Sequence, residues 1–100
     1  MARVIVSDVA DEDMSRISAR LAHEAGSRVA RKYGLRFERL FELIAQRPDM
    51  CAARPGLGPF IRVGIVSPYL VIYRHITGEN IASVIRVVDG RRNIVRSLLP

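Results

Sequence analysis

The feature that most constrains this chain is a run of β-branched and aromatic residues at positions 69–76. A Ser-Pro pair precedes the run and the segment Thr-Gly-Glu-Asn follows it, so a turn signal stands at each end. Similar runs flank it at residues 60–66 and 81–88. The pattern predicts a three-stranded antiparallel meander with residues 69–76 as its middle strand.

The two turns also predict which residues lie opposite each other. A two-residue turn between the first two strands places Arg62 opposite Tyr73, and a turn at residues 77–80 places Val71 opposite Arg86. Successive side chains of a strand point to opposite faces of the sheet. The register therefore sorts the side chains into two faces.

The first predicted face is almost wholly apolar, and we expect helices to cover it. Its residues are Ile61, Val63, Ile65, Leu70, Ile72, Arg74, Ile76, Ile81, Ser83, Ile85 and Val87. The second face carries arginines and tyrosines among apolar residues, and we expect it to be open. Its residues are Phe60, Arg62, Gly64, Val66, Tyr69, Val71, Tyr73, His75, Ala82, Val84, Arg86 and Val88. A slip of one residue in either hairpin would break this grouping.

The first half of the chain predicts a short strand at residues 2–7 and a helix at residues 8–25. Ser7 is a typical N-cap, and carboxylates in the first turn suit the positive end of a helix. Apolar residues recur at helical spacing, and the opposite side carries charged residues. Those charged residues are Asp13, Arg16, Arg20 and Glu24. Gly26 ends this helix.

A second helix is predicted from Ser27, as a cap, to the Arg47-Pro48 pair, because a residue before proline avoids the α region. Gly34 in its interior costs about 1 kcal/mol relative to alanine. It marks either a close approach to the first helix or a break in the second. The short connection at Gly26 predicts an antiparallel helical hairpin that covers one sheet face.

These elements define a single domain of residues 1–100 with an α+β fold. We expect a helical hairpin on one face of a small antiparallel sheet, in the order β-α-α-β-β-β. No apolar run approaches the roughly 20 residues that a membrane span needs, and the N-terminus lacks the apolar stretch of a secretory signal. With Cys51 as the single cysteine, a reducing cytoplasm is the expected compartment and no membrane association is expected.

The formal net charge is +6, and Lys32 is the only lysine among the cations. Two interpretations are open. The charge can serve an acidic partner, either nucleic acid or an acidic protein segment. Alternatively it reflects a compositional bias of the genome, because the arginines are spread along the chain.

No pattern of residues indicates catalysis. His23 and His75 are far apart in the sequence and Cys51 has no neighbouring base, so we expect neither a metal site nor a nucleophile pair. The Gly56-Leu57-Gly58 segment lacks the strand-to-helix context of a phosphate-binding loop. We therefore assign no catalytic residue and no cofactor.

The arginines and tyrosines of the open face remain as the candidate site. Arginines are seldom buried without a partner, so Arg62 and Arg86 either extend to the edge and are solvated or belong to a binding surface. Guanidinium groups suit phosphate or carboxylate, and Tyr69 and Tyr73 can stack or pack against a partner. The valines beside them at 66, 71, 84 and 88 would form an exposed apolar patch that another chain covers.

The sequence from residue 54 to residue 94 resembles the C-terminal half of ParE-type toxins of the RelE/ParE superfamily. The resemblance lies in an Arg-Pro-Gly-Leu loop, then Phe60 and Arg62, then the run Tyr-Leu-Val-Ile-Tyr-Arg, then Ile-Arg-Val-Val-Asp-Gly-Arg-Arg-Asn-Ile. The layout of the first half also matches. The resemblance implies a toxin of a type II toxin–antitoxin system, held inactive by a protein antitoxin whose C-terminal segment is often acidic.

The superfamily has two branches, and the resemblance implies different targets for each. ParE-type toxins inhibit DNA gyrase, whereas RelE-type toxins cleave mRNA on the ribosome. Arg62 and Arg86 match arginine positions of the RelE-type face. However, residues 87–100 contain no Tyr, His or Phe, and no lysine lies at residues 51–59, so a full nuclease set is missing. We therefore expect a gyrase inhibitor that is not an enzyme, with a RelE-like ribosome-dependent mRNA endonuclease as the alternative. An inactive relative that acts only as an interaction module is a third possibility.

The expected partners are a cognate antitoxin, in a hetero-oligomer, and DNA gyrase, with no direct DNA binding by this chain alone. The candidate contact residues for either partner are Arg62, Tyr69, Tyr73, Arg86, Arg91 and Arg92.

Overall fold

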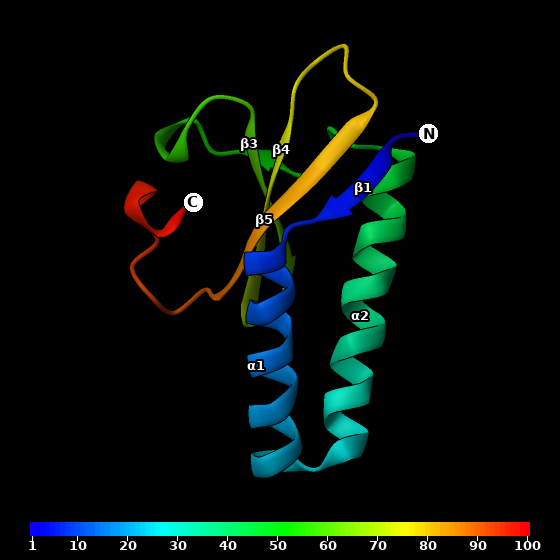
Figure 1. Cartoon of the computed structure of the whole chain (residues 1–100), viewed down its shortest axis with the longest axis vertical. Coiled ribbons are helices and arrows are strands. Elements are labelled where there is room, and N and C mark those ends of the chain that lie inside the picture. Colours follow the sequence, from blue (N-terminus) through cyan, green and yellow to red (C-terminus); the bar gives the residue numbers. More distant parts are fainter.

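The computed structural model describes residues 1–100 and shows two helices packed on one face of a five-stranded sheet (Figure 1). The elements are β1 (Arg3–Val6), α1 (Asp8–Ala25), α2 (Ser27–Gln46), β2 (Ala52–Ala53), the 3-10 turn η1 (Pro55–Leu57), β3 (Ile61–Val66), β4 (Tyr69–His75), β5 (Ile81–Asp89) and the 3-10 turn η2 (Arg96–Leu98). The strand order in the sheet is β1-β5-β4-β3-β2. The predicted α+β fold is confirmed. The sheet is mixed rather than antiparallel, because β1 pairs in parallel with β5 after the helical hairpin.

The helices begin and end where local signals place them. The hydroxyl of Ser7 accepts a hydrogen bond from the backbone N–H of Ala10 at 3.1 Å and caps α1. Gly26, with a φ of 95°, ends α1 and also precedes α2, so Ser27 is the first residue of α2 and not its cap. The prediction for Gly34 was wrong in both forms, because α2 is unbroken there and an added Cβ would meet nothing within 4 Å.

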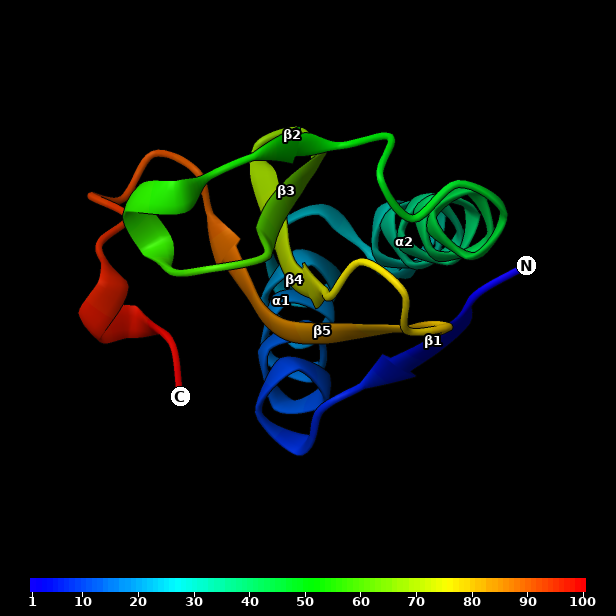
Figure 2. The same ribbon diagram turned by 90° about the horizontal axis from the view of Figure 1, so that it is seen from above.

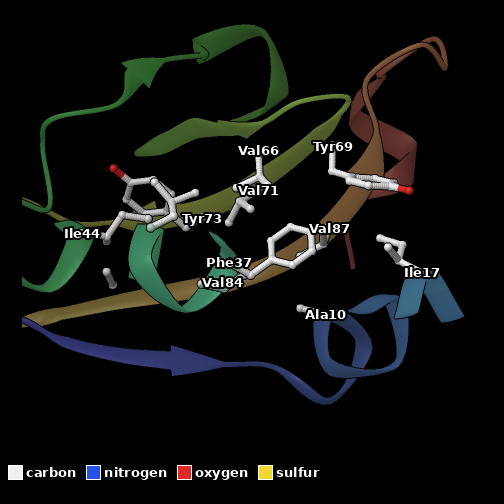
Figure 3. Close-up of a cluster of buried hydrophobic side chains, with 12 residues drawn as sticks. Ala10, Ile17, Phe37, Ile44, Val66, Tyr69, Val71, Tyr73, Val84 and Val87 are labelled. Atoms are coloured by element: carbon white, nitrogen blue, oxygen red, sulfur yellow. The ribbon is translucent and has the colours of Figure 1, made fainter. Parts of the chain in front are cut away.

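The two helices cover the sheet face that the sequence predicted to be open. Val71, Tyr73 and Val84 of this face are each 0% exposed and pack against Phe37 and Ile44 of α2 (Figure 3). The predicted exposed valine patch is therefore wrong, since these residues form the main core. Both faces are rich in branched apolar residues, so hydrophobicity did not distinguish the face that the helices cover.

The second sheet face is covered by coil rather than by helices. Leu57 of η1 and the C-terminal residues Ile94 and Leu99 pack against Ile61 and Ile72 on this side. Figures 1 and 2 show η1 and the C-terminal segment together on the side of the sheet away from α2. This arrangement explains why the second face is also apolar.

The register of the first hairpin is confirmed, and that of the second is confirmed only in part. Arg62 pairs with Tyr73 as predicted, and Tyr73 pairs with Val84 as predicted. A β-bulge then shifts the pairing by one residue, so Arg86 lies opposite Ile72. Because a bulge adds one residue to a single strand, Arg86 is removed from the predicted group with Arg62 and Tyr73.

Candidate functional site

The six predicted contact residues fall into two separate groups. Arg62 and Tyr73 belong to the first, where they hold the segment that leads into β2. Arg62 Nη1 donates to the carbonyl oxygens of Asp49 at 3.0 Å and Cys51 at 2.7 Å. Tyr73 Oη donates to the carbonyl oxygen of Pro48 at 2.7 Å. Burial raises the pKa of the Tyr73 hydroxyl well above its usual value, which keeps it a donor. This group supports the fold.

Replacing Tyr73 with phenylalanine is expected to lower the free energy of unfolding by about 1 to 2 kcal/mol, because the Pro48 carbonyl loses its partner. Urea unfolding followed by circular dichroism measures this difference. The control is Tyr33→Phe, since the Tyr33 hydroxyl makes only an exposed contact of 3.4 Å with the Ser67 carbonyl. Equal changes in the free energy of unfolding for both substitutions would show that the bond from Tyr73 to Pro48 contributes no more than the exposed contact of Tyr33.

The other four predicted residues, Tyr69, Arg86, Arg91 and Arg92, make up the second group. Arg86 joins β5 to α1 and to the C-terminal segment. Its Nε and Nη2 atoms donate to the two carboxylate oxygens of Asp13 at 2.7 and 3.0 Å, and its Nη1 donates to the Leu98 carbonyl at 2.6 Å. Asp13 also accepts from the backbone N–H of Val87 at 3.0 Å. Hydrogen bonding to Asp13 raises the pKa of Arg86. The sequence placed Asp13 on the solvated side of α1, but it is 4% exposed. Its carboxylate accepts the Val87 N–H at the edge of β5, beyond the last residue that pairs with β1.

Tyr69 is buried at the start of β4. Its ring packs edge-on against Tyr33 with a centroid distance of 5.7 Å and lies 5.9 Å from the ring of Phe37. Its hydroxyl accepts a hydrogen bond from Arg20 Nη2 at 3.2 Å. Tyr69 therefore serves the core with its ring and orients an exposed arginine with its hydroxyl.

Arg91 and Arg92 follow the end of β5. The Arg91 side chain donates to both carboxylate oxygens of Asp89, at 2.9 and 2.5 Å, and its backbone N–H donates to the first of them at 2.9 Å. These hydrogen bonds hold the pKa of Asp89 well below its usual value. Arg92 is exposed and forms no ion pair within the chain.

Two adjoining hollows bring the second group together with helix α1. The first has a volume of about 410 Å³ and is lined by Asp13, Arg16, Ile17, Arg20, Tyr69, Arg86, Val87, Val88, Asp89 and Arg92. The second, also about 410 Å³, is lined by Arg20, Leu21, Glu24, Tyr33, Pro68, Tyr69 and Arg91. We call the two hollows together the arginine cleft.

The structure places four of the six predicted residues at the arginine cleft, namely Tyr69, Arg86, Arg91 and Arg92. Sequence reasoning missed Arg16 and Arg20 as members of the site. Their spacing of four residues on the charged side of the first helix was the available signal. It could not be used, because the cleft forms only when α1 covers the face that was expected to be open.

A second concave surface lies between the two helices. This helix groove has a volume of about 360 Å³ and is lined by Met14, Ser15, Ile17, Ser18, Leu21, Ala30, Tyr33, Gly34, Phe37, Glu38 and Phe41. Met14, Tyr33 and Phe41 remain half-buried there. Gly34 keeps the groove open, since it presents no side chain to it. An apolar groove of this kind is typical of a protein-binding site.

The ionisable side chains form no metal-binding cluster, since no three His, Cys, Asp or Glu side chains lie together in a way that could hold a metal ion. The ring of His75 is buried, and both of its nitrogens are within hydrogen-bond distance of a partner. Nδ1 lies 2.7 Å from Asp49 Oδ1 and Nε2 lies 3.1 Å from the Glu79 carbonyl oxygen. None of the helices has the length and apolar character needed to cross a membrane.

Comparisons with known proteins agree with this architecture. A family described as the ParE toxin of the type II toxin–antitoxin system parDE matches residues 4–94. Toxin ParE3 of Caulobacter vibrioides is 31% identical over 98 residues, which cover 98% of this chain and 96% of the relative. A structure of the chromosomal ParDE toxin–antitoxin system from P. aeruginosa has a similar fold. Its TM-score is 0.74 at 18% identity, and the match covers 89% of this chain and 96% of that chain.

Proposed function

Since this chain belongs to the ParE toxin family of type II toxin–antitoxin systems, we propose that it inhibits DNA gyrase and is neutralised by binding a cognate antitoxin. The observation that carries the proposal is the family match over residues 4–94. The concave surfaces are lined mainly by arginines and apolar residues, which supports a binding protein rather than an enzyme. Gyrase as the target makes the bacterial cytoplasm the proposed compartment.

We place the antitoxin contact in the helix groove. The groove offers Phe41, Tyr33 and Met14 as apolar contacts between two helices. An amphipathic antitoxin helix with apolar residues at helical spacing would fit such a surface. The net charge of +6 favours association with an acidic antitoxin segment.

The gyrase proposal is tested by supercoiling of relaxed plasmid with purified gyrase. We expect the folded chain to inhibit supercoiling and to trap cleaved DNA, and we expect prior incubation with the antitoxin to relieve both effects. The control is the preformed toxin–antitoxin complex at the same toxin concentration. Normal supercoiling in the presence of excess folded chain would contradict the proposal.

The alternative, an mRNA endonuclease, draws less support from the geometry. Arg62 and Arg86, which match the RelE-type arginine positions, are both engaged in bonds that hold the fold together. Cleavage of mRNA by this chain during in vitro translation, with gyrase unaffected, would favour the alternative over our proposal.

A further inference from the structure

We propose that the arginine cleft binds the phosphodiester backbone of duplex DNA. This goes beyond gyrase inhibition and departs from the expectation that the chain alone does not contact DNA. The cleft brings together five arginines and three carboxylates from α1, β5 and the segment after β5. The charged residues are Arg16, Arg20, Arg86, Arg91 and Arg92 with Asp13, Glu24 and Asp89.

Two of the three carboxylates of the cleft, Asp13 and Asp89, lie inward of the guanidinium groups. Asp13 is buried, and both its oxygens accept hydrogen bonds from arginines. Both oxygens of Asp89 accept from Arg91. In contrast, the side chains of Arg16 and Arg91 are 68% and 74% exposed. A ligand that enters the cleft therefore meets the outer arginines before Asp13 and Asp89, and Glu24 is the one exposed carboxylate of the lining.

Several of these cations are held in place before any ligand binds. Arg20 is bonded to the Tyr69 hydroxyl, Arg16 to Asp13 and Arg91 to Asp89. Arg16 and Arg20 are one helical turn apart, a rise of about 6 Å. That rise spans about two phosphate steps of a DNA strand, each about 3.4 Å along the axis. Arginines oriented in this way suit phosphate oxygens, which they can contact bidentately.

The cleft fits a nucleic-acid backbone better than an acidic protein segment. A protein partner gains much of its affinity from a few large side chains that fill desolvated pockets. In the first hollow of the cleft, which holds most of its arginines, the apolar residues Ile17, Val87 and Val88 are buried, at 9%, 2% and 3% exposure. The half-buried apolar residues of the cleft, Leu21, Tyr33 and Pro68, lie in the second hollow. Apolar contact is available in the helix groove instead, at residues such as Phe41. Phosphate binding needs only the cations.

The test compares two triple variants that lose the same charge. Arg16, Arg20 and Arg92 are changed to glutamine in the cleft variant, because the amide can keep a hydrogen bond to Asp13 or Tyr69. Arg31, Arg47 and Arg54 are changed to glutamine in the control variant, since these arginines are exposed and lie outside the cleft. Binding of a fluorescein-labelled duplex is measured by anisotropy from 25 to 200 mM salt.

We expect the unmodified chain to bind the duplex with a salt dependence that the cleft variant loses in large part. Each lost phosphate contact reduces the slope of log K against log salt by about 0.9, so three contacts reduce it by about 2 to 3. The control variant is expected to keep most of the slope. Thermal unfolding by circular dichroism verifies that both variants are folded.

Three outcomes would overturn the proposal. One is the absence of duplex binding at the lowest salt, and another is an equal loss in both variants, which would reflect net charge alone. The third is tighter binding of a labelled polyglutamate peptide than of DNA through the same three arginines. None of these readouts involves gyrase, so the DNA proposal and the gyrase proposal can fail independently.

Discussion

Replacing Asp13 with alanine is expected to lower the free energy of unfolding by about 3 to 5 kcal/mol, the range for breaking a buried charge pair. The carboxylate is 4% exposed and bonds Arg86 through both of its oxygens. Its removal leaves a largely buried guanidinium without a counter-ion and the Val87 N–H without an acceptor. Urea unfolding gives the difference from the shift in midpoint at a constant m-value.

The control for this substitution is Glu12→Ala, an exposed carboxylate on the same helix, which is expected to change stability by no more than about 0.5 kcal/mol. Arg86→Ala should resemble Asp13→Ala, and the double variant should lose less than the sum of the two. Additive effects would mean that the two residues act separately. If Arg86→Ala reduces toxicity, the expected loss of stability is sufficient to explain the reduction, and a lost contact with the target is not needed.

Replacing Phe41 with aspartate is expected to weaken antitoxin binding by about 2 to 4 kcal/mol, or roughly 30-fold to 1,000-fold. The substitution removes an apolar contact from the helix groove and places a carboxylate where the antitoxin would bury it without a partner. Phe41 is only half-buried, so the domain is expected to keep its fold. Titration calorimetry with the purified cognate antitoxin measures the change.

Leu35→Asp provides the matched control for the groove. Leu35 lies on the same helix, is 59% exposed and does not line the groove. It is expected to bind the antitoxin with nearly unchanged affinity. If both aspartate variants bound as tightly as the unmodified chain, the antitoxin would have to dock elsewhere.

The elements and the first hairpin could be predicted from the sequence because the signals are local. Ser7, Gly26 and Pro48 mark helix boundaries, and the Ser-Pro turn fixes the pairing of Arg62 with Tyr73. The face assignment failed for a physical reason. The C-terminal segment covers the second face, so both faces carry apolar residues and neither pattern identifies the helical side.

The arginine cleft could not be predicted, because it depends on a bulge and on a buried charge. The register shift between Ile72 and Tyr73 moves Arg86 from its predicted place opposite Val71 to a place opposite Ile72, and no residue type in β5 signals it. Asp13 itself resembles an ordinary carboxylate on the charged side of the first helix, so its burial was not evident. Arg16 and Arg20 meet Arg86 and Arg92 in one hollow of the folded domain, although they are far apart in the sequence.

Because the C-terminal segment packs on the second sheet face, a mutation that alters only the end of the gene can inactivate the toxin. Ile94 and Leu99 complete the second core, and the bond from Arg86 to the Leu98 carbonyl secures them. A frameshift just before these codons would leave Ile72 and its neighbours uncovered. Chains that expose such a face are removed by proteases or aggregate. A nearly full-length reading frame can therefore encode a toxin that never accumulates.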